Sequence, residues 1–257
     1  MRIATWNVNS IKMRLEAVLG WLKASHIDAL LLQEIKCETA NFPAMEFQSA
    51  GYKTHALGQK AYNGVAIVSR HAIEDVIEHL PEAGEDVQSR YLEATIKGIR
   101  VASIYLPNGN PIDTEKFTYK LAWLERLRRH MKKLLESETP VVLGGDYNVI
   151  PEATDVYDPK RWENDALFHP KSRAAFRELE ALGYADAFRV LHPQKKHAYT
   201  FWDYTGGAWE RDTGLRIDHF LLSPEAVDRL ANCFIDLTPR GQEKASDHTP
   251  VVVELRD

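Results

Sequence analysis

Several short apolar runs in this chain end on an acidic or amide residue, and this repeated pattern limits the possible folds. The clearest run is 140–149, PVVLGGDYNV, in which a β-branched stretch reaches Gly144 and Gly145 and is followed by Asp146 and Asn148. β-Branched residues without polar neighbours are typical of a strand buried on both faces. Side chains two residues apart point the same way in an extended chain, so we expect Asp146 and Asn148 side by side at a strand end. Taken alone, these residues favour an ordinary turn at the end of a strand.

Other apolar runs have the same form and are separated by turn residues or by helical patterns. We predict strands at residues 2–8, 28–34, 64–69, 99–107, 216–222 and 249–255. Helices are predicted at 11–22, with Ser10 as its N-cap, at 113–138 and at 172–182. The strands, roughly a dozen with the weaker ones, exceed what one open sheet usually carries. We therefore expect two packed sheets in a mixed α/β layered fold, and a single domain over residues 1–257.

Composition and cysteine content narrow the class of protein. The 257 residues are 44% hydrophobic and 27% charged, which is ordinary for a globular protein. Cys37 and Cys233 are far apart in sequence, which argues against a disulfide framework or a zinc site and favours the cytoplasm. The chain has no secretory pattern at residues 1–7 and no apolar run of membrane-spanning length. The net charge of −5 does not indicate a nucleic-acid binder, but local charge at a groove is what decides this.

The basic residues of the predicted helix 113–138 have a simple explanation. Arginines and lysines at positions 126–133 lie on the faces opposite a regular apolar stripe. A solvated helix face explains them better than contact with nucleic acid.

Acidic residues at the strand ends point to a cation. If Glu34, Asp146, Asp218 and Asp247 converge, two such charges about 4 Å apart repel by on the order of 4 kcal/mol at an effective dielectric near 20. The donors are oxygens with one nearby histidine, which favours Mg²⁺ or Mn²⁺ over zinc. Because Mg²⁺ usually keeps only one or two protein carboxylates and binds substrate phosphates, the pattern favours phosphoryl chemistry.

Each of these residues also has a structural explanation. Asp218, inside an apolar strand, could pair with Arg216 or Lys244, and His248 could cap the turn before the last strand. Tyr105 alone is more often a packed aromatic residue with a satisfied hydroxyl group. Only the combination of these residues favours a functional site.

Seven segments in order resemble the exonuclease III/abasic-site endonuclease family, within the superfamily that includes deoxyribonuclease I, inositol polyphosphate phosphatases and sphingomyelinases. The segments are WNVNS at 6–10, LQEIK at 32–36, GVAI at 64–67, YLPNG at 105–109, GGDYNV at 144–149, LRIDH at 215–219 and SDH at 246–248. The resemblance implies a four-layer α/β sandwich of the deoxyribonuclease I type, with two mixed sheets and a divalent-metal cleft. It also implies a Mg²⁺-dependent enzyme, in which Mn²⁺ can substitute, and we expect this enzyme to be a monomer. Such an enzyme acts on duplex DNA, cutting 5′ of abasic sites, degrading 3′ ends and removing 3′-terminal phosphate groups.

The resemblance also assigns roles to the metal-site residues. Glu34 resembles the principal metal ligand, with Asn7 and Asp247 beside it. We therefore expect these three side chains around one Mg²⁺ ion.

The catalytic roles implied by the resemblance fall on five residues. Asp146 would orient and deprotonate the attacking water, and Asn148 would hold the geometry. His248, supported by Asp218 or Asp247, would bind a phosphate oxygen, and Tyr105 would hydrogen-bond to the phosphate or a neighbouring acid. These groups would stabilise the charge that develops on the phosphate.

Substrate contacts are expected from an aromatic segment and from scattered polar residues. In the family, the region matching 199–215 forms an apolar pocket, for which we choose Phe201 and Leu215, with Trp202 as a further candidate. A core position explains Trp202 and Trp209 at least as well. The candidate DNA contacts are Lys60, Arg90, Lys195, Lys196 and Asn108, of which the pair Lys195 and Lys196 fits solvated surface better.

Two alternative functions are open at this stage. The same scaffold could hydrolyse a small or lipid phosphate ester, in which case an aromatic pocket segment would not be expected. It could also bind nucleic acid without catalysis, but a missing carboxylate would be expected in that case, and every expected one is present.

Overall fold

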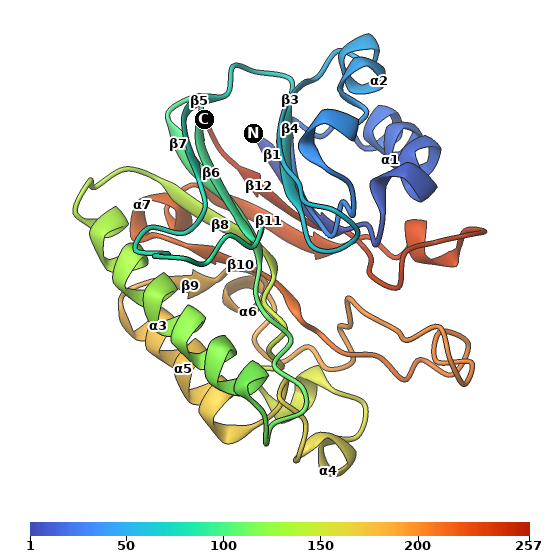
Figure 1. Ribbon diagram of the computed structural model, residues 1–257, viewed down its shortest axis with the longest axis vertical. Helices are drawn as coiled ribbons and strands as arrows, with labels where there is room; N and C mark the ends of the chain where they lie inside the picture. Colours follow the sequence, from blue (N-terminus) through green and yellow to red (C-terminus); the bar gives the residue numbers. More distant parts are fainter.

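The computed structural model describes residues 1–257 and contains two six-stranded mixed sheets (Figure 1). The first sheet has the order β11(Leu230–Ile235), β12(Val251–Leu255), β1(Arg2–Asn7), β2(Ala29–Gln33), β4(Val65–Ser69), β3(Lys53–Leu57). The second has the order β5(Glu74–Glu78), β6(Tyr91–Ile96), β7(Ile99–Tyr105), β8(Val141–Asp146), β10(Asp218–Leu222), β9(Ala185–Asp186). Only β1 with β2, and β7 with β8, pair in parallel.

The two sheets pack face to face over an apolar core. This core is a cluster of 23 buried residues that includes Leu31 and Ile67 from the first sheet and Val101 and Phe220 from the second. These side chains come from the β-branched and aliphatic runs that the sequence pattern assigns to buried strands.

Helices cover the outer face of each sheet, which completes four layers (Figure 1). The first sheet is covered by α1(Ile11–Ser25) and α2(Ala44–Ser49), and the second by α3(Glu115–Leu135) and α5(Pro170–Ala181). The shorter helices are η1(Thr39–Asn41), η2(Ala153–Asp155), α4(Pro159–Trp162), α6(Ala187–Leu191), α7(Pro224–Val227) and η3(Pro239–Gly241). The predicted two-sheet α/β sandwich is confirmed. No helix has the length and apolar character needed to cross a bilayer.

Several basic residues of helix α3 pair with acidic side chains. Arg126 pairs with Asp86 at 2.7 Å, and Arg129 and Lys133 both pair with Glu82 at 2.9 and 2.8 Å. These cations are therefore neutralised by surface acids, as expected for a solvated helix face.

Two local predictions were wrong. Ser10 does not cap α1 with its side chain; it has a φ of 90°, and its N–H donates to the carbonyl oxygen of Glu34 at 2.8 Å. The start of α1 is thus bound to the loop after β2. The chain is also not extended through Asn148, because β8 ends at Asp146 and Asn148 adopts the left-handed region with a φ of 47°.

Candidate active site

The polar strand ends meet because of the strand directions. In the parallel pairs β1/β2 and β7/β8, the carboxyl ends share an edge, which brings together Asn7, Glu34, Tyr105 and Asp146. The antiparallel strand β10 begins at this edge, with Asp218 directly opposite Asp146 in the register. The sequence feature that unites these residues is therefore the end of a strand, as predicted.

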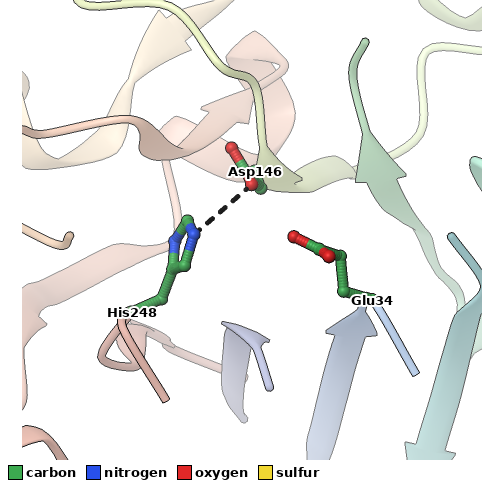
Figure 2. A group of neighbouring side chains, drawn as sticks. All are labelled: Glu34, Asp146 and His248. Atoms are coloured by element: carbon green, nitrogen blue, oxygen red, sulfur yellow. Dashed lines mark ion pairs between the residues drawn. The ribbon is translucent and has the colours of Figure 1, made fainter. Parts of the chain in front are cut away.

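Glu34, Asp146 and His248 form the centre of the site, as Figure 2 shows. One potential ligand atom from each side chain lies within 4.8 Å of those of the other two. Nε2 of His248 is 3.7 Å from Oδ2 of Asp146. The three side chains come from segments more than one hundred residues apart and face a common point.

Asn7 connects the two carboxylates. Its Nδ2 donates to Oε1 of Glu34 and to Oδ2 of Asp146, both at 2.9 Å. Its Oδ1 accepts from the N–H of Asn9 at 3.0 Å, which fixes the orientation of the amide. Asn7 therefore presents hydrogen-bond donors to the carboxylates, while its own oxygen faces away from them.

His248 is held between two carboxylates. Its Nδ1 is 2.8 Å from Oδ2 of Asp218, and both side chains are almost fully buried. Burial alone would lower the pKa of His248, but the negative charges of Asp218 and Asp146 raise it to about 10. The ring is therefore an imidazolium with two N–H donors at neutral pH. Asp218 pairs with His248 and not with Arg216, whose guanidinium binds Asp155 and Asp186.

Asp146 has an unusually high proton affinity. Burial raises its pKa to about 7, with the neighbouring carboxylates of Asp218 and Glu34 adding to the effect and His248 opposing it. Its Oδ1 accepts from the N–H of Asn148 at 3.0 Å, which orients the carboxylate. The Asn148 side chain in turn donates to the carbonyl of Leu106 at 2.9 Å.

Glu34 and Tyr105 respond to the same environment in opposite ways. Burial favours the neutral form of Glu34, but the Asn7 amide and the Lys36 ammonium, 3.0 Å from Oε2, bring its pKa below the ordinary value. Burial, together with the charges of Glu34 and Asp146, raises the pKa of Tyr105 well above 10. Tyr105 therefore keeps its hydroxyl proton beside these acids.

The donors at this site fit a hard divalent cation. Glu34 and Asp146 offer carboxylate oxygens here, and the raised pKa of His248 favours the form of its ring that cannot bind a metal. A buried Oδ1 of Asp218 has no hydrogen-bond partner. Oxygen donors favour Mg²⁺ or Mn²⁺ over zinc, and a bound cation would offset the repulsion among these carboxylates.

A cleft of about 260 Å³ surrounds these residues. Its polar side is formed by the acids and amides above. Its apolar side is formed by four side chains, Trp162, Leu167, Phe201 and Ile217. The site therefore joins a charged reaction centre to an apolar wall.

Some predicted residues lie in this cleft and others do not. Asp247 and Asn108 line it, although Oδ1 of Asp247 is bound by Nδ2 of Asn9 at 3.1 Å. Leu215 is only 1% exposed and packs with Ile150 and Phe168 beneath the cleft, so its expected place in the pocket wall is not observed.

Trp202 faces away from the cleft. It is 2% exposed and packs with Tyr199, Ala208 and Trp209, as the core alternative proposed. Adjacent residues of an extended chain point in opposite directions, so Phe201 faces the cleft and its neighbour does not.

Of the basic residues predicted to contact DNA, one lies beside the cleft and the others lie away from it. Arg90 lies beside the cleft, with its guanidinium 4.8 Å from the Tyr105 ring centroid, in a hollow that Asn108 shares. Lys60 and Lys196 are exposed and outside the cleft, and Lys195 lines a separate pocket with Trp202.

Several residues of the cleft were not predicted from the sequence. Trp162 and Asp165 lie in the long connection after β8, and Asn110 lies in the loop after β7. Nδ2 of Asn110 donates to both carboxylate oxygens of Asp165 at 3.1 Å, which joins these two segments. Their only sequence signal is the concentration of Pro, Asp and Asn in connections that are long for an ordinary turn.

Comparison with protein families identifies the chain. Residues 4–248 match the model of the endonuclease/exonuclease/phosphatase family. The chain belongs to this family. The matched range includes every residue of the site described above, from Asn7 to His248.

Two curated relatives of the family align along nearly the whole chain. An exodeoxyribonuclease of Bacillus subtilis is 30% identical over 98% of this chain and 98% of its own length. The DNA repair nuclease APEX1 of Danio rerio is 30% identical over 99% of this chain and 82% of its own length.

Solved structures of the family extend the comparison to the fold. An AP endonuclease from Archaeoglobus fulgidus is 41% identical, with a TM-score of 0.96 over 100% of both chains. The 3′ phosphatase NExo from Neisseria, bound to a product DNA hairpin, is 40% identical, with a TM-score of 0.98 over 100% of both chains. The predicted resemblance to exonuclease III and abasic-site endonucleases is confirmed.

Proposed function

We propose that this chain is a metal-dependent DNA-repair nuclease that cuts duplex DNA 5′ of abasic sites and removes nucleotides and phosphate groups from 3′ ends. The observation that carries this proposal is the convergence of Glu34, Asp146 and the His248–Asp218 pair at the mouth of one cleft. The relatives named above, an AP endonuclease, an exodeoxyribonuclease and a 3′ phosphatase, support the substrate class.

Glu34 is the residue that would hold Mg²⁺, or Mn²⁺ in its place, with the carboxylate of Asp146 facing the same point. The bound ion would supply Lewis-acid polarisation of the scissile phosphate. Asn7 keeps the two carboxylates at a fixed separation through its two donors.

Asp146 would orient the attacking water and accept its proton. Its Oδ1 is fixed by the Asn148 N–H, and its Oδ2 faces the cleft beside Asn7 and His248. A general base must be held within hydrogen-bond reach of the proton that it takes, and these contacts provide such a fixed position.

The imidazolium of His248, the Asn148 amide and the Tyr105 hydroxyl would bind the phosphate oxygens. As the water oxygen attacks phosphorus, negative charge develops on the non-bridging oxygens. Donors fixed in advance beside those oxygens stabilise that charge without reorganisation. The Asp218 carboxylate keeps the His248 ring charged and oriented.

The apolar wall suits a sugar that lacks its base. Phe201 and Trp162 would face the base-less sugar, while Arg90 and Asn108 would contact phosphates of the same duplex. A net charge of −5 makes such local contacts necessary for DNA binding. We expect a monomeric, single-domain protein, and its two buried free cysteines fit a reducing compartment such as the cytoplasm.

A gel assay on duplex DNA with one abasic site tests this function. We expect wild-type protein with Mg²⁺ to cut the strand 5′ of the site, and Asp146→Asn or a chelator to abolish cutting. Asp228→Asn, an exposed acid after α7 at the opposite end of β10, is the matched control and should cut normally. Undiminished cutting by Asp146→Asn would contradict the mechanism. Hydrolysis of a phosphoinositide without DNA cleavage would instead favour a small-substrate phosphoesterase.

A further inference from the structure

A lysine interrupts the apolar stripe of helix α3. Phe117, Leu124, Leu127 and Met131 are buried at helical spacing, and Lys120 occupies the position between the first two. Lys120 is fully buried, with 0% exposure. A charged residue in this position is unusual, because the basic residues of α3 otherwise lie on its outer faces.

The buried amino group of Lys120 binds two carbonyl oxygens beneath the cleft. Nζ of Lys120 donates to the carbonyl oxygen of Asn108 at 3.0 Å and to that of Asn148. Asn108 belongs to the loop after β7, and Asn148 to the turn after β8. One side chain from the outer helical layer therefore joins the two segments that follow the central parallel strands.

Both segments carry side chains of the active-site cleft. Nδ2 of Asn108 donates to Oδ1 of Asn148 at 3.4 Å, and both amides line the cleft. The N–H of Asn148 holds Oδ1 of Asp146 at 3.0 Å. A displacement of the Asn148 turn would therefore move the carboxylate of Asp146 as well.

The loop after β7 is shaped around the lysine. Gly109 has a φ of 90°, and a Cβ at this residue would lie 2.6 Å from Cδ of Lys120. Only glycine allows the backbone to follow the aliphatic stem this closely without strain. The contact thus depends on both Gly109, which permits the close approach, and Lys120, which binds the loop carbonyl.

Stability alone does not explain a lysine here. Burying a cation is costly, and burial lowers the pKa of Lys120 to about 7 in spite of the charges of Asp146 and Asp165. Replacing buried charges with well-packed apolar residues of similar volume is often neutral or stabilising. A methionine would fill this site without the desolvation cost but could not bind the two carbonyls.

We propose that Lys120 is a positioning residue for phosphodiester hydrolysis, which sets Asn108 and Asn148, and through Asn148 the carboxylate of Asp146, by binding both backbone carbonyls. This proposal rests on the nuclease function proposed above. Lys120 does not reach the cleft itself, so its effect on the reaction passes through these two asparagines.

The variant Lys120→Met tests the proposal against a matched control on the same helix. Leu127→Ala removes a buried side chain of α3 that does not contact the cleft. Turnover and KM on abasic-site duplex, and thermal unfolding, would be measured for both variants. We expect Lys120→Met to lower kcat by on the order of 10- to 100-fold with little change in KM, because small misplacements of reacting groups have such effects. Leu127→Ala should lose stability but keep its kcat.

The outcomes separate this proposal from the nuclease function itself. Wild-type kcat in folded Lys120→Met, or an equal loss of kcat in Leu127→Ala, would overturn the positioning role. Should Lys120→Met not fold, Gly109→Ala decides, since it displaces the loop while keeping the lysine: a lowered kcat supports the proposal and an unchanged kcat refutes it. Absence of DNA cleavage by the wild-type protein would instead refute the nuclease function.

Discussion

Nδ1 of His248 lies 2.8 Å from Oδ2 of Asp218, and the other ring nitrogen lies 3.7 Å from Oδ2 of Asp146. Burial opposes the charge on the ring, but the two carboxylates outweigh it and raise the pKa of His248 to about 10. The raised pKa favours a buried cation at this position. Such a cation suits the binding of a phosphate oxygen better than proton exchange with solvent.

We predict that Asp218→Asn lowers kcat for DNA cleavage by about 100-fold, the usual effect of losing one fixed donor to a developing oxyanion. The neutral amide removes the main counter-charge of His248, so the pKa of the ring should fall. Single-turnover cleavage and an NMR titration of the His248 ring would measure the two effects. Asp228→Asn again serves as the control. An unchanged His248 pKa in Asp218→Asn would contradict the coupling described here.

Asn7 allows a prediction about metal binding. Because its amide donates to both Glu34 and Asp146, we expect Asn7→Ala to weaken Mg²⁺ affinity by on the order of 10- to 100-fold, as is typical when a partner of the ligands is lost. Glu34→Gln, which removes a proposed ligand, should abolish measurable binding. Calorimetric titration of both variants with Mg²⁺ makes the comparison independent of activity. Equal loss in the two variants would indicate that Asn7 is itself a ligand.

His219 provides a pH-dependent stability that is separate from catalysis. Its Nε2 donates to the carbonyl of Val149 at 2.8 Å, and its Nδ1 accepts from Arg216 at 3.1 Å. Burial, followed by the Arg216 charge, lowers the pKa of His219 from 6.5 to about 4. Between pH 4 and pH 6.5, His219 binds a proton in the unfolded chain but not in the folded protein. Stability from this residue is therefore complete above pH 6.5 and is lost as the pH falls toward 4.

We predict that His219→Gln removes this part of the acid sensitivity. A glutamine can donate to Val149 and accept from Arg216 but does not titrate in this range. The wild-type protein should lose on the order of 3 kcal/mol more than the variant between pH 7 and pH 4. Urea unfolding of both proteins at several pH values measures the difference. Parallel pH profiles would show that the pKa of His219 is the same in the folded and unfolded protein, which would contradict the prediction.

The convergence of the site could be predicted because strand ends are encoded locally. Runs such as 141–146 and 29–33 are short, apolar and followed by a polar residue, so both the strands and the polar ends are visible in the sequence. The parallel pairing that brings these strand ends together depends on the topology of the sheets. Hydrophobic periodicity does not predict that pairing, whereas the family resemblance predicts the common cleft. The sequence left open a turn or an extended chain at Asn148, because asparagine tolerates a positive φ as well as an extended one.

Other features of the site depend on contacts between residues far apart in the chain, which a local sequence pattern does not predict. Lys120 lies at the spacing of the apolar stripe, and this is the one signal that could have identified it. Trp162 lies in the cleft on a segment that is bound through Asp165 to Asn110, 55 residues earlier in the chain. The single-residue alternation that places Phe201 and Trp202 on opposite sides is visible in the sequence, but which of the two faces the cleft is decided by packing against distant residues.

The contrast between Phe201 and Trp202 gives a further prediction. Phe201 is half-buried, lines the cleft and has its ring centroid 5.0 Å from that of His248. Trp202 is buried, donates its indole N–H to Asp212 at 3.0 Å and lies edge-on to Trp209. Truncating the first should affect the substrate, and truncating the second should affect the fold.

We predict that Phe201→Ala raises KM for abasic-site duplex by roughly 10- to 100-fold, equivalent to the loss of about 1.5–3 kcal/mol of apolar contact with the base-less sugar. Its thermal stability should change little, because the ring is partly exposed. Trp202→Ala should instead cost about 3–5 kcal/mol of unfolding free energy through the cavity that it leaves. At a temperature where it is folded, its KM should stay near the wild-type value. Steady-state kinetics and urea unfolding of the two variants make the comparison, and a raised KM in Trp202→Ala with no loss of stability would show that the cleft extends behind Phe201.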